Sequence, residues 1–274
     1  MKQAYFQILK DLIKIPSPSG SEQAIANHIL TSYCKNGWIA ELDGLHNILF
    51  CPIGDEKDEM LPLLYAHTDT HPNGKSNSHL LPFNDIISLD TNGQVQKKHE
   101  IQVGFDDKAG VAAILYLMLH TDRKFRALLV TQEEIALNGG SYGRQGGGGI
   151  DFALNNSFSW VFQQSKCVIA LDRMGDKEII SAYGNDVIRK KISLCSLDFS
   201  KNIENVSKAC NFPMKAIDSR NIADVYNIRR RFPNLDCVNL SIGYQDEHRP
   251  KESLSIDATL GVIHFLMCLI QTKT

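Results

Sequence analysis

The sequence has no long uncharged apolar run, because none of its windows offers the ~18 consecutive apolar residues that cross a bilayer. Its first segment, MKQAYFQILKDLIKIP, carries Lys10, Asp11 and Lys14 among the apolar positions, so it lacks the uninterrupted core of a secretory signal peptide. A net charge of -2 also leaves no excess of basic side chains. We therefore expect neither a membrane nor nucleic acid as a partner.

Cysteine motifs are equally scarce. The seven cysteines are odd in number, scattered and mostly embedded in apolar segments, and none of them forms the CxxC spacing of a metal or redox site. Reduced thiols inside a core are typical of the cytoplasm, where we expect this protein to act.

Alternating strand-like and helix-like segments are what the chain does contain. Its 274 residues, 43% of them hydrophobic, are enough for one full core, and we find no internal repeat or low-complexity linker. Helices are predicted over the opening residues up to 13, over 22–34 with Ser21 as N-cap, and over 107–120, 201–210 and 255–272. Strands are predicted over 38–42, 47–51, 61–66, 126–132, 166–172, 187–199 and 235–243. This order predicts an α/β fold with a mixed, largely parallel central sheet and helices on both faces, formed by residues 1–274 as a single domain.

Polar side chains follow five of the strand-like segments, including IQVGF at 101–105, at the point where each segment ends. Because ligand sites in α/β sheets lie at the carboxyl ends of the strands, we expect these side chains to meet at one edge of the sheet. They are His67 and Asp69, Asp106 and Asp107, Glu133 and Glu134, Asp172, and His248.

Each of these residues has a simpler structural explanation when it is taken alone. An aspartate in front of helix 107–120 is most simply its N-cap, with a charge that the helix dipole favours. A single histidine after a strand is more often hydrogen-bonded than bound to a metal. Glu133 and Glu134 could face opposite sides of a strand end, and Asp172 could form a surface ion pair with Arg173.

Taken together, the same residues favour a metal site. Two histidines with several carboxylates and no cysteine are nitrogen and oxygen ligands, which suit zinc and also cobalt or manganese. So many carboxylates exceed the needs of one zinc ion, but they suit two ions about 3.5–4 Å apart that share a bridging aspartate. The adjacent acids Glu133 and Glu134 fit this hypothesis, because neighbouring like charges beside a core need a positive partner.

Five motifs of the chain resemble those of a known family. HTD, GFDDKAGVAAI, QEEIALNGG, ALDRMG and the histidine of DEHRPKESLSI stand in the order found in the di-zinc exopeptidases of the peptidase T, glutamate carboxypeptidase and acetylornithine deacetylase type. The flanking segments IPSPSGSEQAIANHI and ADVYNIRRRFPNLDCVNLSIGY are similar as well, so the resemblance covers most of the chain.

By position, the resemblance implies five ligands for two zinc ions and two further catalytic side chains. It assigns His67 and Asp172 to the first ion, Glu134 and His248 to the second, and Asp106 to the bridge between them. Asp69 would orient the other imidazole nitrogen of His67. Glu133 would be the general base and acid, taking a proton from water and giving it to the leaving amine.

The activity that this resemblance implies is hydrolysis of short peptides, with an aminopeptidase as the main hypothesis. Asp172 stands where carboxypeptidases and deacetylases of the family have Glu, and DRMG and ADVYN are similar to peptidase T. One alternative is a deacylase that removes N-acyl groups from amino acids with the same metals. Another is a metal-binding or peptide-binding protein without catalysis. A phosphate cradle at GRQGGGG is disfavoured, because no GK[ST] follows it.

One departure from the family concerns its lid domain. A lid of about a hundred residues, a common size for a domain, does not fit between Asp172 and His248. Only 75 residues lie there, and they must also supply part of the sheet. The chain thus resembles the compact aminopeptidases of the same clan, and its oligomeric state stays open. Candidates to frame the substrate in place of a lid are His71, Asn73, His79, Tyr244, Arg220, Asp224 and the loop 139–149, which we interpret as a mobile flap.

Overall fold

The computed structural model describes residues 1–34, 37–55, 59–71, 86–91, 94–97, 102–134, 148–185, 190–220 and 224–271. The helices are α1 (Lys2–Ile13), α2 (Gln23–Tyr33), α3 (Phe105–His120), α4 (Gly148–Asn155), α5 (Ser159–Gln163), α6 (Leu197–Ala209), α7 (Val225–Arg231) and α8 (Ile256–Gln271). The strands are β1 (Trp38–Leu42), β2 (Ile48–Pro52), β3 (Leu61–His67), β4 (Ile87–Leu89), β5 (Val95–Lys97), β6 (Arg126–Val130), β7 (Ser165–Arg173), β8 (Glu178–Asn185), β9 (Lys190–Ser193), β10 (Lys215–Ser219), β11 (Asp236–Ser241), β12 (Tyr244–Gln245) and β13 (Ser253–Leu254).

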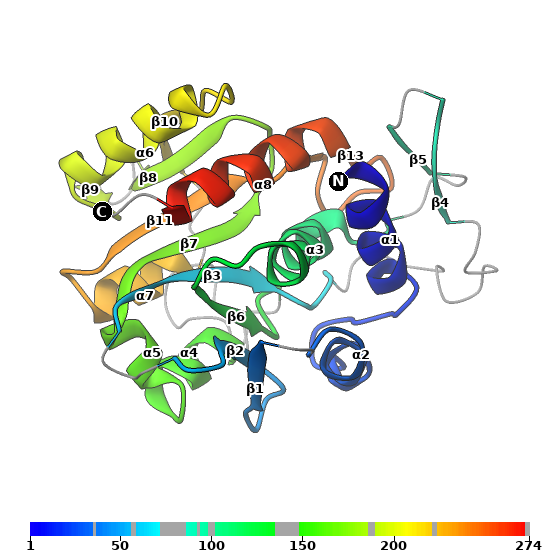
Figure 1. Ribbon diagram of the computed structural model, residues 1–274, viewed down its shortest axis with the longest axis horizontal. Coiled ribbons are helices and arrows are strands. Elements are labelled where there is room, and N and C mark those ends of the chain that lie inside the picture. Colours follow the sequence, from blue (N-terminus) through cyan, green and yellow to red (C-terminus); the bar gives the residue numbers. More distant parts are fainter. Residues whose placement is uncertain are drawn as a thin grey trace.

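One large twisted sheet runs through the middle of the molecule (Figure 1). Its strand order is β1-β2-β6-β3-β7-β11-β8-β10, with β9 paired to β8. The central strands β6, β3, β7 and β11 are mutually parallel, whereas β1 and β2 at one side and the β11–β8 pair are antiparallel. The predicted mixed, largely parallel sheet is therefore confirmed, and its central strands end at one edge.

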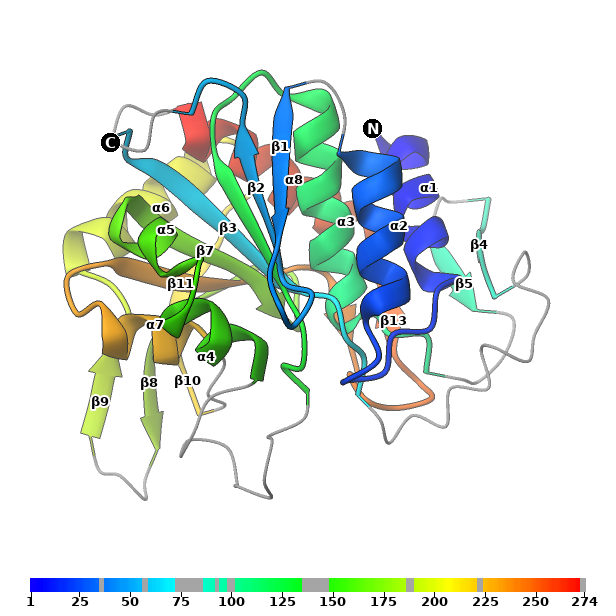
Figure 2. The ribbon, with the colours of Figure 1, turned by 90° about the horizontal axis from the view of Figure 1, so that it is seen from below.

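Helices cover both faces of this sheet. Figure 2 shows α1, α2 and α3 on one side of it and α4, α5 and α7 on the other. The buried side chains form two corresponding clusters: the larger contains residues of α1, α2, α3, α6 and α8, and the smaller contains residues of α4, α5 and α7. Central strands that are covered on both faces explain the nearly continuous apolar runs of the sequence.

Helix α3 lies in the centre of the larger cluster, which accounts for its apolar character on all sides. It packs so closely on β7 that a Cβ atom added to Gly110 would lie 2.5 Å from the backbone oxygen of Leu171. A glycine at this position allows the helix to approach the sheet. The same approach fixes the beginning of α3, where Asp106 and Asp107 stand, relative to the ends of the strands.

Three local predictions were wrong. IQVGF does not form a strand over its described residues, because Gly104 takes a left-handed conformation with φ 78° and α3 begins at Phe105. Of the strand predicted over 187–199, the described residues begin at 190 and are extended only in β9, because Ser196 caps α6 by accepting the N–H of Phe199 at 3.2 Å. Ser21 does not cap α2, whose N-cap is Glu22.

The segment between Asp172 and His248 builds part of the main sheet. It supplies β8, β10 and β11, and it also carries α6 and α7. The pattern of the sequence did not predict β8, β10 or α7. The basic residues Arg229, Arg230 and Arg231 form the last turn of α7.

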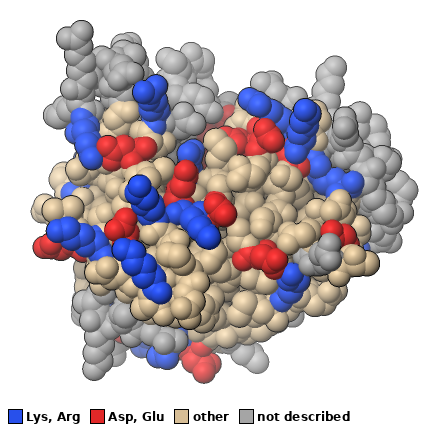
Figure 3. Space-filling model, turned by 90° about the horizontal axis from the view of Figure 1, so that it is seen from above, with Lys and Arg blue, Asp and Glu red and all other residues tan. Residues whose placement is uncertain are grey.

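Two further observations concern the described residues as a whole. None of their helices combines the length and the apolar composition that crossing a bilayer requires. On the face shown in Figure 3, basic and acidic side chains are interspersed among the described residues, as the small net charge suggests.

Candidate metal centre

The carboxyl ends of β3, β6 and β7 bring four of the predicted side chains to one place. His67 is the last residue of β3 and pairs with Val130 at the end of β6, and Glu133 and Glu134 follow in the next turn. Asp172 is near the end of β7, which is also parallel to β3. The predicted convergence at this edge is thus present in the structure.

Asp106 lies between the two histidines. Its Oδ1 is 3.1 Å from Nε2 of His67, and its Oδ2 is 3.1 Å from Nε2 of His248. The carboxylate therefore presents one oxygen to each imidazole, and both side chains of the pair Asp106–His67 are almost completely buried. A carboxylate in this position has one oxygen available for each of two ions.

Two ligand groups surround this aspartate. On one side, Nε2 of His67 lies 3.5 Å from Oδ1 of Asp172. On the other side, Nε2 of His248 lies 2.7 Å from Oε1 of Glu134. Donor atoms of His67, Asp106 and Asp172 all lie within 4.8 Å of one another, as do donor atoms of His71, Glu134 and His248. Either group could hold a metal ion.

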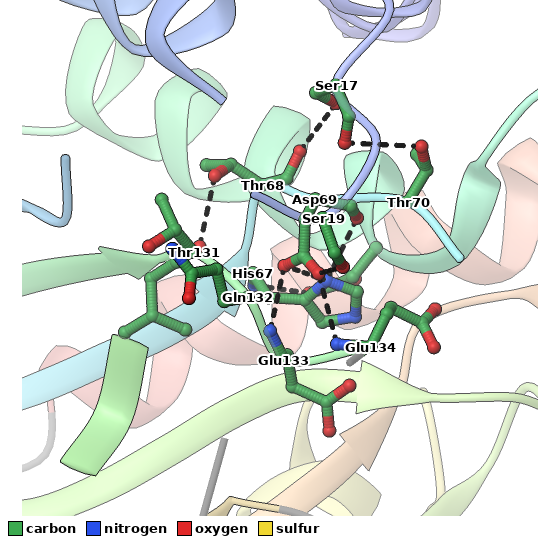
Figure 4. Close-up of polar contacts among 12 residues, drawn as sticks. Ser17, Ser19, His67, Thr68, Asp69, Thr70, Thr131, Gln132, Glu133 and Glu134 are labelled. Carbon is green, nitrogen blue, oxygen red and sulfur yellow. Dashed lines mark hydrogen bonds and ion pairs between the residues drawn. The ribbon is translucent and has the colours of Figure 1, made fainter. Parts of the chain in front are cut away.

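Asp69 connects His67 with the turn that carries the two glutamates (Figure 4). Its carboxylate accepts the hydroxyl of Ser19 and the backbone N–H groups of Glu133 at 3.1 Å and Glu134 at 3.0 Å. Nδ1 of His67 is 3.4 Å from Oδ1 of Asp69 and 3.1 Å from its backbone oxygen. Asp69 is thus placed to orient the imidazole, but most of its hydrogen bonds hold the glutamate turn.

The turn itself separates the two glutamate side chains. Gln132 has a positive φ of 57°, and its N–H donates to the buried carboxylate of Glu22 at 3.0 Å. Figure 4 shows the carboxylates of Glu133 and Glu134 pointing in different directions from this turn. Glu134 reaches His248, whereas Glu133 is half-buried and has a carboxylate oxygen within 4.8 Å of His67 and Glu134 donor atoms.

The adjacent acids Asp106 and Asp107 have different environments. Asp107 accepts the N–H of Gly110 at 3.0 Å and the N–H of His67 at 3.2 Å. The first of these bonds is the capping interaction that the sequence suggested for this helix, and both aspartates have non-helical backbone angles. Asp107 caps the regular part of α3, which leaves the side chain of Asp106 directed to the histidines.

The carboxyl groups of the centre repel one another. Burial, followed by the charge of Asp172, raises the pKa of Glu133 well above its usual value, and burial with the charge of Asp106 raises that of Glu134 to about 7. Burial also raises the pKa of Asp172. Burial opposes ionisation of Asp106 as well, but hydrogen bonds from His248 and His67 lower its pKa overall.

These shifts show that the buried negative charge is not fully offset by the neighbouring side chains. A cation among the carboxylates would favour their ionised forms. Asp106 and Asp172 raise the pKa of His67 well above its usual value despite burial, so the imidazole is protonated without a metal. A metal ion bound to Nε2 would take the place of that proton. The donor set and its charge therefore fit a divalent metal.

Three residues that the sequence did not reveal support the centre from outside. Asn239 on β11 donates to the backbone oxygen of Asp172 at 2.7 Å and accepts its N–H at 3.0 Å. Glu252 is buried and accepts the N–H groups of Val103, Gly104 at 2.7 Å and Phe105 at 3.3 Å. The third is Ser19. A polar residue inside the apolar run DCVNLS was a signal for Asn239, whereas KESLSI offered none for Glu252.

The proposed substrate-framing residues are only partly described. Tyr244 donates its hydroxyl to Oδ1 of Asp172 at 3.3 Å, and His71 stacks on His248 with ring centroids 4.4 Å apart. Asp224 is buried and accepts the hydroxyl of Tyr65. Arg220 directly follows β10. Asn73, His79 and residues 139–147 of the predicted flap lie outside the described residues, and Gly148 and Gly149 belong to α4.

Comparison of the whole chain with solved structures identifies the fold. The sheet and its helices have the fold of zinc-exopeptidase catalytic domains, so the fold that the sequence motifs implied is confirmed. The chain is similar to aminopeptidase PepT from Bacillus cereus, with a TM-score of 0.73, 12% identity and 98% of each chain covered. It is also similar to a tripeptidase from Staphylococcus aureus (TM-score 0.73, 12% identity, covering 99% of this chain and 98% of that one).

A third similar structure is aminoacylhistidine dipeptidase from Vibrio alginolyticus. The TM-score is 0.68 at 11% identity, with 98% of this chain and 96% of that one covered. No protein-family model matches the sequence, and no curated protein matches it either. At these identities the similarity defines the fold alone.

Proposed function

We propose that the protein is a metal-dependent hydrolase, a di-zinc aminopeptidase that cleaves short peptides. The observation that carries this proposal is the position of Asp106, whose two carboxylate oxygens each lie 3.1 Å from a different histidine. A structural ion pair needs one such contact. Two equivalent contacts on opposite oxygens support a bridge between two ions.

Five side chains would hold the ions. His67 and Asp172 would bind the first, Glu134 and His248 the second, and Asp106 would bind both. Nitrogen and oxygen donors of this kind suit zinc, and cobalt or manganese could replace it. When bound, the two ions would lower the pKa of a water molecule and polarise the scissile carbonyl.

Glu133 would be the general base and acid of the reaction. Its backbone is fixed by Asp69, and its side chain lies beside both ligand groups, where it forms no ion pair with another described residue. Its carboxylate would take a proton from the attacking water and pass it to the leaving amine.

The substrate class follows from the compact architecture. Residues 173–247 belong largely to the main sheet and its helices, which supports a single catalytic domain without an inserted lid. The similar structures are called an aminopeptidase, a tripeptidase and a dipeptidase, and these names favour short peptides. All seven cysteines are free, which favours action in the cytoplasm. A deacylase acting on N-acyl amino acids is the second candidate, because the same metal ligands would serve it.

The decisive experiment is an activity screen of the purified protein against di- and tripeptides with free and with N-acetylated amino groups. We expect cleavage of the free peptides, loss of activity with a chelator, and recovery with zinc, cobalt or manganese. Selective cleavage of the N-acetylated substrates would replace the aminopeptidase by the deacylase. Hydrolysis that resists the chelator, or a purified protein that binds no metal, would overturn the proposal.

A further inference from the structure

His71 is a third histidine at the centre, and the mechanism above gives it no role. It follows β3 in the chain, two residues after Asp69, and its side chain is half-buried. Its imidazole lies against that of His248, with the ring centroids 4.4 Å apart and an angle of 19° between the ring planes. His71 therefore stands on the side of the centre that Glu134 and His248 form.

The donor atoms on this side form a compact set. One ligand atom each from His71, Glu134 and His248 lies within 4.8 Å of the other two, and the His248–Glu134 distance is 2.7 Å. Two imidazole nitrogens and one glutamate oxygen are the protein ligands of several catalytic zinc sites, in which a fourth position stays open. The set would thus be a sufficient zinc site even before the shared Asp106 is counted.

We propose that His71 is a direct ligand of the second metal ion, together with Glu134 and His248. This inference rests on the proposed function, since it adds a protein ligand to an ion which that function requires. With His71 included, three histidines bind metal, whereas the proposed function has two.

The two ion sites then differ in chemistry. The first ion has one imidazole, from His67, and otherwise carboxylates, whereas the second has two imidazoles. Imidazole favours zinc and cobalt over manganese, which prefers oxygen ligands and has the lowest affinity in the divalent series. The second site should therefore fill first with zinc and discriminate more strongly against manganese than the first site does.

A structural role for His71 is the competing explanation, because its ring could simply support that of His248 by stacking. Two substitutions separate these roles. His71→Phe keeps an aromatic ring but has no donor atom, and His71→Asp keeps a donor oxygen but has no ring. His71→Ala removes both. His120→Ala is the matched control, because His120 is an exposed histidine at the far end of α3 from Asp106.

The test is a zinc titration of the metal-free full-length protein in competition with a chromogenic chelator, which gives the number and affinity of bound ions. We expect two ions in the wild type, and an affinity for one of them that is weaker by at least about 10-fold in His71→Phe and His71→Ala, because even residues that only support a ligand cost 10–100-fold. His71→Asp should retain most of the affinity, and His120→Ala all of it. The visible absorption of the cobalt-loaded protein should change in His71→Phe and stay unchanged in His120→Ala.

Two results would overturn the inference. If His71→Phe binds both ions as tightly as the wild type, the histidine is not a ligand, and wild-type peptide cleavage would leave the proposed function intact. If His71→Ala weakens binding but His71→Phe restores it, the role of His71 is stacking. A wild-type protein that binds no ion would overturn the proposed function, and the inference with it. Circular dichroism of the metal-free variants establishes that they are folded before the comparison is made.

Discussion

The carboxylate of Asp69 accepts the backbone N–H of Glu133 at 3.1 Å. The same carboxylate lies 3.4 Å from Nδ1 of His67 and also accepts the N–H of Glu134. One buried side chain thus holds a residue at the end of β3 and the turn that follows β6. The position of the proposed base and the orientation of a proposed metal ligand depend on a single aspartate.

Asp69→Asn should disturb both of these functions. An asparagine side chain has only one accepting oxygen. Its NH₂ group would therefore face a group that now donates a hydrogen bond to Asp69, either the hydroxyl of Ser19 or a backbone N–H. We expect metal affinity and kcat/KM to fall by about 10–100-fold each. A chelator competition assay and steady-state kinetics with a tripeptide measure these effects. Ser19→Ala, which leaves the backbone bonds in place, should cost clearly less, and an equal loss in both variants would argue against the central role of Asp69.

Glu133→Gln should remove turnover and leave the metals bound. Glutamine keeps the size and most of the polarity of the side chain but cannot take up the proton of the attacking water. We expect kcat to fall by about 10²–10⁴-fold, the usual contribution of a general base. Metal content is to be measured by elemental analysis of the same sample, with Glu41→Gln on the exposed side of β1 as a control. Loss of metal from Glu133→Gln would mean that this residue is a ligand.

Gly110→Ala should destabilise the fold at the contact between α3 and β7. The added methyl group would lie 2.4 Å from Oδ1 of Asp107 and 2.5 Å from the backbone oxygen of Leu171, so helix and strand must move apart. We expect a loss of about 1–3 kcal/mol in the free energy of unfolding, as for other overpacked sites. Urea unfolding measures it. In Gly184→Ala, where the nearest atom is 4.0 Å from the new Cβ, stability should hardly change. Equal stability of both variants would contradict the close contact.

Glu252→Gln should change how stability depends on pH. Burial raises the pKa of Glu252 to about 7 in the folded protein, above the usual range of a glutamate carboxyl. A carboxyl group with a raised pKa favours the folded state most below the unfolded pKa, and this contribution is lost as the pH rises towards 7. Glutamine stays neutral throughout. The stability of the wild type relative to Glu252→Gln should therefore fall between pH 5 and pH 8.

Chemical unfolding of the metal-free proteins at several pH values tests this expectation. Glu59→Gln, which replaces a half-buried carboxylate that pairs with Lys124, serves as the control for the loss of a carboxylate. A stability difference that grows with pH would mean that Glu252 is ionised in the fold and stabilised by its three backbone donors.

The sequence allowed most of the core elements to be predicted, because their patterns are local. The nearly continuous apolar runs at β3, β6 and β7 identify strands that are buried on both faces, and α8 is recognisable from the length of its apolar segment. Predictions failed where a single residue changes the backbone. Gly104 ends the apparent strand IQVGF with a positive φ, and Ser196 begins a helix in the middle of an alternating pattern.

The candidate site was predictable as a set of residues but not as an arrangement. The motifs named His67, Asp106, Glu133, Glu134, Asp172 and His248, and the structure places their donor atoms together. The different roles of Asp106 and Asp107 could not be predicted, because two adjacent residues of the same type look alike in a sequence. In the structure, Asp107 caps the helix by accepting the N–H of Gly110, whereas Asp106 contacts the histidines. Roles for these residues as ligands and base remain predictions for the experiments above.

The amino-acid sequence by itself determined the class of fold and the chemical types at the strand ends, since hydrophobic periodicity and donor types are properties of short segments. Tertiary structure alone decided which of them meet. Asp106 reaches two histidines from opposite ends of the chain, and His71 lies on His248, because parallel strands and the close packing of α3 on β7 bring distant segments to one edge. Distances between such segments depend on packing over the whole molecule, which no local pattern contains.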